Sequence, residues 1–197
     1  FLVAASFFCI NSGMANIFKP LIDLQDGQFK SQSWYRNAAS LITNKATASK
    51  LMSSGKLIGR PSGGRMNLFF YDPKTKGKLP FYDIFPLVLP LETFSGGFIG
   101  LNFHYLPYGA RYKFLSELQR YASNGKFDKS TRLQVSYDDI KGVGFTKAAI
   151  KRYLYKQVRS NFLRVNTDEM AIAINLPVAQ FKKASLGKVF ADSRSKY

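Results

Sequence analysis

A chain of 197 residues is long enough for one domain with a full core, and its single cysteine excludes an internal disulfide and a cysteine-based zinc site. Hydrophobic residues make up 46% and charged residues 21% of it, which excludes a disordered or fibrous chain. Its 29 Lys and Arg against 12 Asp and Glu give a net charge of +17, so the surface should attract polyanions: nucleic acid first, then an anionic membrane or an acidic protein.

The first ten residues, FLVAASFFCI, are apolar but too short to span a bilayer, and no basic residue precedes them as in a signal peptide. Met14 opens the segment MANIFKPL. We therefore expect residues 1–13 to lie upstream of the true start or to come from a truncated reading frame. An ordinary buried segment and a targeting signal are the alternatives.

A short helix is predicted over residues 31–42, SQSWYRNAASLI, because its apolar side chains have helical spacing and Ser31 or Ser33 can cap its start. Residues 47–65 are rich in Ser, Gly and basic residues, a composition typical of a flexible connector. We therefore predict a helical arm with a basic connector over residues 14–65 and a main domain over residues 66–197.

The centre of the chain predicts strands. The first predicted strand is MNLFFYDP. The turn DPKTKGK follows it, and we expect the basic side chains of this turn mainly to solubilise a hairpin. FPLVLPLE and FIGLNFHYL are two more, joined by the glycine turn TFSGG. Pro86 and Pro90 cannot donate to a strand ladder, so their strand should lie at an edge or be bulged. Residues 66–110 carry three basic and three acidic side chains, so this segment should form the core.

The C-terminal half alternates in type. We predict an amphipathic helix over 109–123 that ends at Gly125, then a short strand over 130–137. The pattern of 146–164, with Thr146 as a cap and an apolar stripe every four residues, predicts a long helix. A strand over 169–177 and a final helix with a basic tail over 178–197 follow. The fold class is α+β: a small bent antiparallel sheet with a central hairpin, packed with three or four helices.

Basic residues concentrate after residue 110. No acidic residue lies between Asp139 and Asp168, whereas solvated helix faces ordinarily mix both signs. One face of the helix expected over 146–164 should therefore follow phosphates, and a merely solvated face is the alternative. GRPSGGR, at 59–65, is a second candidate because its glycines let backbone amides approach an anion; a plain linker is the alternative. The predicted DNA-binding residues are Arg60, Arg65, Lys147, Lys151, Arg152, Lys156, Arg159, Arg164, Lys182, Lys183, Lys188 and Arg194.

Candidate catalytic residues are few. His104 is the only histidine, and without a second His or Cys it makes no conventional zinc site, so we expect a structural, hydrogen-bonded histidine. Asp138 and Asp139, with Asp72 and Asp83, have the chemistry to hold Mg²⁺, but adjacent aspartates more often cap a helix or form a turn. We predict no catalytic residue, no metal and no cofactor.

Several segments carry a resemblance. The longest is FFYDPKTKGKLPFYDIFPLVLPLETFSGGFIGLNFHYLP followed by RYKFLSEL; the others are SQSWYRNAA, IGRPSGGRM, AIKRYLYKQVRSNFLRV and SLGKVFADSRSKY. In these the chain resembles the DNA end protector family of T4-like tailed phages, marine ones above all, or another minor virion protein of such phages. The resemblance covers most of residues 14–197.

The resemblance implies a virion protein that is packaged with the genome, binds the ends of linear double-stranded DNA and shields them from host exonuclease in the cytoplasm after injection. It also implies a role in head completion, with phage head or neck proteins as partners. It supplies no catalytic residue, and no membrane partner is expected.

Three hypotheses follow. The first is a non-enzymatic DNA-binding protein that contacts the phosphate backbone and recognises shape or ends, because no base-reading motif is evident. The second is a structural virion component of the neck, head or baseplate that binds an acidic protein. The third, a nuclease that depends on Asp138 and Asp139, is the weakest.

Overall fold

A computed structural model describes residues 16–53 and 56–195 of the chain. The segment 1–13, expected to lie upstream of the true start, falls outside these residues. Among the described residues, no helix combines the length and apolar character needed to cross a membrane.

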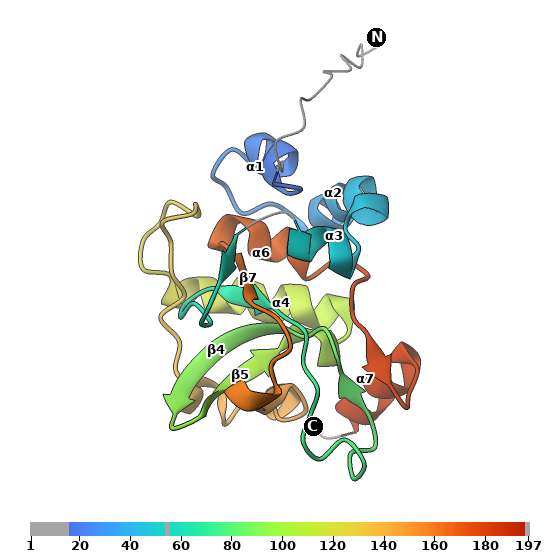
Figure 1. Cartoon of the computed structure of the whole chain (residues 1–197). Coiled ribbons are helices and arrows are strands. Elements are labelled where there is room, and N and C mark those ends of the chain that lie inside the picture. Colours follow the sequence, from blue (N-terminus) through green and yellow to red (C-terminus); the bar gives the residue numbers. More distant parts are fainter. Residues whose placement is uncertain (1–15, 54–55, 196–197) are drawn as a thin grey trace.

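The described residues form a six-stranded antiparallel sheet in the order β1-β7-β2-β4-β5-β6 and a separate two-stranded pair, β3-β8. The β4–β5 hairpin lies at the centre of the fold (Figure 1). Strands and helices together confirm the predicted α+β class. The strands are β1 Leu57–Ile58, β2 Met66–Leu68, β3 Tyr82–Asp83, β4 Leu87–Phe94, β5 Gly97–Asn102, β6 Ile150–Leu154, β7 Phe162–Val165 and β8 Phe181–Lys182.

Helices cover one face of the large sheet. Figure 1 shows α4 and α6 above β4 and β5, with α2 and α3 beyond them. The main hydrophobic core includes side chains from α1, α2 and α3 as well as from the sheet, α4 and α6. The division into an arm and a main domain remains a prediction. The helices are α1 Lys19–Gln25, α2 Gln32–Ile42, α3 Ala48–Ser53, α4 Tyr108–Leu118, α5 Tyr137–Ile140, α6 Thr167–Ala173 and α7 Leu186–Arg194.

Several predicted elements are confirmed. Helix α2 begins where the Ser31 hydroxyl accepts a hydrogen bond from the backbone N–H of Trp34, as the sequence indicated. Tyr35, Ala38 and Ile42 are buried along it, although Leu41, expected on the same face, is 73% exposed. Helix α4 begins one residue before the predicted helical segment 109–123 and ends inside it. Helix α7 lies within the predicted helical segment 178–197.

The strand that contains Pro90 is bulged but does not lie at an edge. β4 lies between β2 and β5, and its pairing with β5 shifts register between Pro90 and Glu92. The bulge removes the need for a backbone donor at Pro90. Opposite Pro90 stands Gly100, where an added Cβ would lie 2.3 Å from Val88 Cγ1. The hairpin turn itself uses Gly96, with φ +87°.

The long helix predicted over 146–164 is wrong. These residues form β6, a 3-10 turn over Tyr155–Gln157, and β7. The apolar residues Ile150 and Leu154 are four apart, a spacing that fits a strand face as well as a helix stripe. Tyr153 decides between the two, because its ring stacks on Phe98 of β5 in a second aromatic cluster on the opposite face of the sheet.

The strand predicted over 169–177 is also wrong, since α6 occupies most of it. A capping box between Asn166 and Glu169 starts this helix, and each of its residues is buried. A helix that is buried on all sides lacks the amphipathic period, so its apolar run resembles a core strand.

Three smaller predictions are corrected. The strand expected over 130–137 is reduced to one isolated bridge between Ala122 and Leu133. The chain leaves α4 through a 3-10 turn at Gln119–Tyr121, without a left-handed cap at Gly125. The connector expected over 47–65 contains α3 and β1, and β1 pairs with β7.

Candidate nucleic-acid interface

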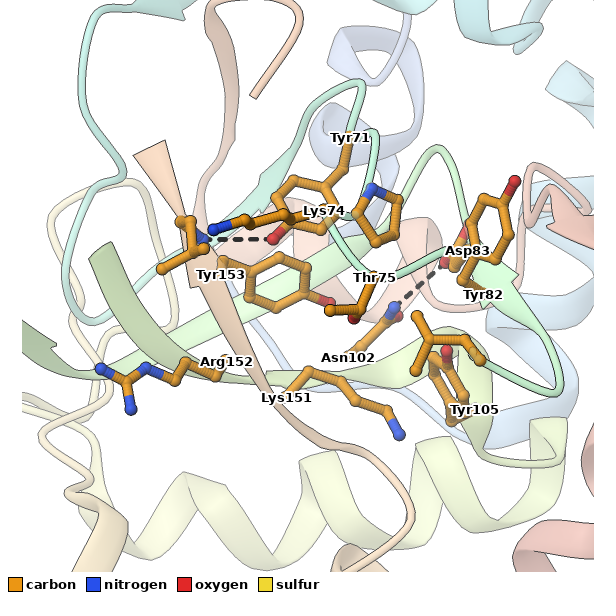
Figure 2. A pocket seen from close by; sticks show the side chains of 13 residues that line it. Tyr71, Lys74, Thr75, Tyr82, Asp83, Asn102, Tyr105, Lys151, Arg152 and Tyr153 are labelled. Carbon is orange, nitrogen blue, oxygen red and sulfur yellow. Dashed lines mark hydrogen bonds between the residues drawn. The ribbon is translucent and has the colours of Figure 1, made fainter. Parts of the chain in front are cut away.

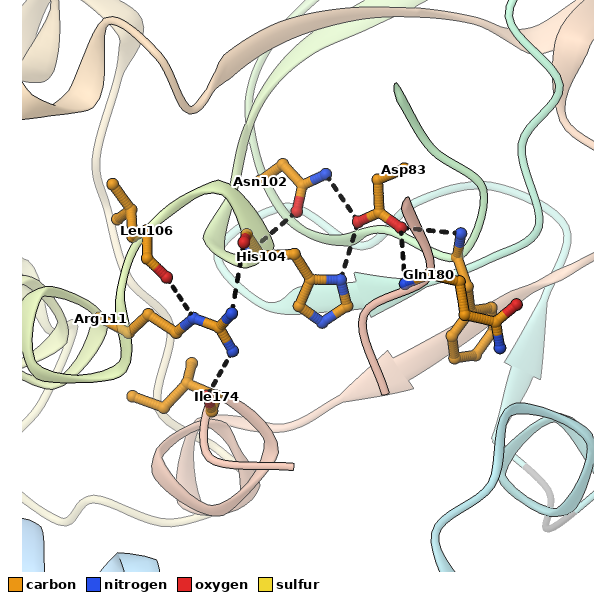
Figure 3. Close-up of polar contacts among 8 residues, drawn as sticks. Asp83, Asn102, His104, Leu106, Arg111, Ile174 and Gln180 are labelled. Atoms are coloured by element: carbon orange, nitrogen blue, oxygen red, sulfur yellow. Dashed lines mark hydrogen bonds and ion pairs between the residues drawn. The ribbon is translucent and has the colours of Figure 1, made fainter. Parts of the chain in front are cut away.

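A buried polar network holds the end of the central hairpin. The Oδ2 atom of Asp83 accepts a hydrogen bond from Asn102 Nδ2 at 3.1 Å and lies 2.8 Å from His104 Nδ1 (Figure 3). Its Oδ1 atom accepts from the backbone N–H of Phe85 at 3.0 Å and of Gln180 at 3.4 Å. His104 is fully buried, and burial lowers its pKa although Asp83 opposes the shift. The prediction of a structural, hydrogen-bonded His104 is confirmed.

Arg111 extends this network to the helical layer. Its guanidinium is buried and donates to the carbonyl oxygens of Leu106 at 2.7 Å, Ile174 at 2.8 Å and His104 at 3.3 Å (Figure 3). The ring of Tyr108 lies 4.4 Å from the guanidinium carbon. Burial lowers the pKa of Arg111 to about 10, so the side chain keeps its charge at neutral pH.

A cavity of about 460 Å³ opens between the loop that precedes β3 and the strands β5 and β6. Four tyrosines line it: Tyr71, Tyr82, Tyr105 and Tyr153 (Figure 2). Asp83 and Asn102 line it too, so the polar network forms part of its wall. The Tyr153 ring stacks on Phe98, and the Tyr71 hydroxyl accepts from the backbone N–H of Leu154 at 3.2 Å. The rings that face the cavity are therefore fixed by contacts behind them.

Three cationic side chains line the same cavity. Lys74 is exposed on the loop, and Lys151 extends over the ring of Tyr105, with Nζ 4.1 Å from the ring centroid. Arg152, the next residue of β6, lies 3.9 Å over the ring of Phe94. Figure 2 shows the Tyr153 ring between Lys74 and Lys151 and the Tyr105 ring beside Lys151, while the Arg152 side chain extends away from the rings. Cations beside aromatic faces are the combination that binds nucleotides.

The loop that carries Lys74 is held in place from both sides. Lys183, which follows β8, donates through Nζ to the carbonyl oxygens of Lys76 at 2.6 Å, Gly77 at 3.1 Å and Leu79 at 3.1 Å. Within the loop, Lys76 Nζ lies 2.8 Å from Asp72 Oδ1. Lys183 thus fixes the backbone of this loop.

Five of the predicted DNA-binding residues lie at this cavity or at the loop beside it. Besides Lys151, Arg152 and Lys183, the strand residue Lys182 pairs with Tyr82, and Arg159 lies 3.6 Å from Asp72 Oδ2. They come from β6, from the loop before β7, and from β8 and the residue after it, not from one helix face. The single basic helix face expected over 146–164 is therefore absent, but the strands still place several of these cations near each other.

The other predicted residues are dispersed. Arg60 lies 5.8 Å over the ring of Tyr155, and Arg164 is half-buried on β7. Lys156 lies in the 3-10 turn after β6, Lys147 precedes β6, and Lys188 and Arg194 lie on α7. Arg65 is 6% exposed and donates to the carbonyl oxygen of Lys129, so it points into the protein.

The aspartates considered for Mg²⁺ have other partners. Asp139 forms the capping box of α5 with Ser136, and Asp138 lies 2.6 Å from Lys141 Nζ. Asp72 pairs with Lys76, and Asp83 belongs to the buried network. Within residues 16–53 and 56–195, no group of three or more His, Cys, Asp or Glu side chains has the arrangement to hold a metal ion.

Comparison with known families identifies the relationship. The family described as phage T4 terminal DNA protecting protein matches residues 24–195. The chain belongs to this family. The match contains all twelve basic residues predicted to bind DNA, and membership of the family supports protection of DNA ends. No curated protein and no solved structure matches the chain.

In this terminal DNA protecting protein, the tyrosines that line the cavity were not predicted from the sequence. Tyr71, Tyr82, Tyr105 and Tyr153 come from four separate segments, and only the antiparallel sheet brings them together. A compositional indication existed: tyrosines alternate with basic residues in FYDPKTKGKLPFYD and in IKRYLYKQVR. Such interleaving is typical of surfaces that bind nucleic acid.

Proposed function

We propose that this terminal DNA protecting protein acts without catalysis, by binding the ends of the linear double-stranded phage genome and blocking access by host exonuclease. The observation that carries the proposal is the gathering of Lys74, Lys151 and Arg152 around one aromatic cavity in a chain of net charge +17. Membership of the family supports action at DNA ends.

The exposed and half-buried basic side chains are proposed to contact phosphates. Their charges attract the backbone of any sequence, which suits a protein that must bind genome ends of different sequence. Arg65 is left out of this set, because its guanidinium is buried and bonded to the Lys129 carbonyl. The proposed phosphate contacts are Arg60, Lys74, Lys147, Lys151, Arg152, Lys156, Arg159, Arg164, Lys182, Lys183, Lys188 and Arg194.

Exonuclease digestion tests this function. Linear and covalently closed circular duplexes are incubated with a duplex-specific exonuclease, with and without the purified protein, and intact DNA is quantified. We expect the protein to preserve the linear duplex and to leave the circle unchanged. A linear duplex that is digested equally fast with the protein present overturns the proposal, and cleavage of the circle indicates a nuclease instead.

A pair of charge variants makes the test specific. Lys151→Glu with Arg152→Glu should abolish most of the protection, because two of the three cations at the cavity are replaced by anions that repel phosphate. Lys113→Glu, which changes an exposed lysine on α4, is the control and should protect like the unaltered protein.

We further propose that the protein is carried in the virion and takes part in head completion. Quantitative mass spectrometry of purified particles, before and after protease treatment of their exterior, tests this. Protein that survives the treatment lies inside the particle with the genome, and its absence from particles contradicts the proposal.

A second candidate function is a structural role in the head or neck, through an acidic protein partner. The observation that favours it is the exposure of two leucines on the N-terminal helices, Leu24 at 67% and Leu41 at 73%. Exposed apolar side chains of this size are common at assembly surfaces. Failure to protect linear DNA, combined with recovery in the particle exterior, is the result expected of this role.

A further inference from the structure

The cavity between the loop before β3 and strand β6 has the size of a small-molecule site. Its volume of about 460 Å³ lies within the roughly 300 to 1,000 Å³ typical of such sites. A DNA duplex is too wide to enter a space of this size, but one unpaired nucleotide fits it. The cavity thus suits a part of DNA that has left the double helix.

The walls suit a nucleobase. Tyr71, Tyr105 and Tyr153 are each at least 92% buried and keep fixed ring positions, while Tyr82 is half-buried at the side of the cavity. Aromatic rings in fixed positions stack on a base without regard to its identity. The hydroxyls of these tyrosines and of Thr75 add groups that hydrogen-bond a base edge.

The charges decide which end of a nucleotide enters. The Asp83 carboxylate lines the cavity and accepts from Asn102 and from the backbone of Phe85, so its negative charge is fixed there. It disfavours a phosphate beside it. Lys74 and Lys151 line the cavity as well, Lys74 from the exposed loop. An uncharged base therefore fits near Asp83, and the phosphate fits at the lysines.

We propose that this cavity receives one unstacked nucleotide from the end of the DNA, with its base among the tyrosines and its phosphate at Lys74 and Lys151. The inference rests on the proposed function and explains its preference for ends. A terminal nucleotide loses one stacking neighbour when it leaves the helix, whereas an internal nucleotide loses two. The cavity therefore selects an end over the interior of the same duplex.

Fluorescence anisotropy with three labelled duplexes tests the proposal on the full chain. The first duplex is closed by a non-nucleotide linker at one end and fully paired at the other. The second is identical except for a mismatch in its terminal pair, which removes most of the cost of unpairing. The third is a dumbbell closed at both ends by the same linker, so it offers no unpaired nucleotide. We expect the mismatched end to bind roughly tenfold more tightly than the paired end, and the dumbbell to bind most weakly.

Two variants of the cavity complete the test. Thr75→Trp, on the exposed turn, fills the cavity, and Tyr82→Ala removes a stacking ring. Each should reduce the preference for the mismatched end to about twofold or less, while dumbbell binding, which needs only backbone contacts, stays within about twofold. Ser116→Trp places the same side chain on exposed α4 and should keep the full preference. If Thr75→Trp or Tyr82→Ala also loses dumbbell binding, the mismatch preference of the other variant decides the test.

The outcomes separate this inference from the function on which it rests. A protein that prefers ends to the dumbbell but binds paired and mismatched ends equally keeps the proposed function and loses the nucleotide cavity. Full retention of the mismatch preference by a folded Thr75→Trp or Tyr82→Ala variant also overturns the inference. A protein that binds the dumbbell as tightly as the open duplexes contradicts end binding itself.

Discussion

The buried guanidinium of Arg111 joins three backbone segments that lie apart in the chain. It donates to carbonyl oxygens of His104, Leu106 and Ile174, and so links the end of the central hairpin to the helical layer. This role of Arg111 was not predictable from the sequence, because an arginine in a basic chain is expected at the surface. His104, by contrast, was predicted correctly from its isolation.

Arg111→Ala should lower the free energy of unfolding by about 3 kcal/mol or more, because it leaves three buried carbonyls without a donor and opens a cavity. Urea denaturation followed by circular dichroism measures the change. Arg120→Ala is the matched control. Arg120 is exposed in the 3-10 turn that follows α4, so its loss should change the free energy of unfolding by about 0.5 kcal/mol or less. Equal effects of the two substitutions would show that the Arg111 hydrogen bonds contribute nothing.

Elements with strong local determinants were predictable from the sequence, and elements that depend on distant partners were not. The β4–β5 hairpin and its bulge follow from Pro90 and the glycine turn, and α2 follows from its Ser31 cap. Strand β6 depends on Tyr153 packing against β5, and α6 depends on burial from every side. The sequence pattern within a segment does not reveal contacts with distant partners. Residues 146–164 were therefore predicted as a helix and residues 169–177 as a strand, each the wrong type of element.

Gly100 shows how tightly the β4–β5–β6 part of the sheet is packed. An added Cβ would lie 2.3 Å from Val88 Cγ1 and 3.1 Å from the Leu89 carbonyl oxygen. Gly100→Ala should therefore destabilise the protein by about 1 to 3 kcal/mol, as overpacking does, measured as a lower midpoint of urea unfolding. Gly77→Ala, where a Cβ meets nothing within 4 Å, is the control and should be neutral or slightly stabilising. Equal midpoints for both variants would contradict the close packing.

At the scale of the whole molecule, composition predicted more than local pattern did. The excess of basic residues indicated a polyanion as the partner. Membership of the terminal DNA protecting family agrees with DNA as that polyanion. The arrangement of that charge was not predictable, since it depends on how β6, β8 and the loop carrying Lys74 meet. The aromatic cavity between them was missed for the same reason.

Binding through this charge should depend steeply on salt. If about six phosphates are neutralised, the logarithm of the association constant should fall with the logarithm of salt concentration at a slope of about −5, alike for duplexes of different sequence. Lys151→Gln with Arg152→Gln removes two contacts and should make the slope shallower by about 2, whereas Lys45→Gln with Lys113→Gln, two exposed lysines away from the cavity, should leave it unchanged. Anisotropy titrations at several salt concentrations give these slopes. Weaker binding with an unchanged slope would mean that Lys151 and Arg152 act on the structure of the site and do not touch phosphate.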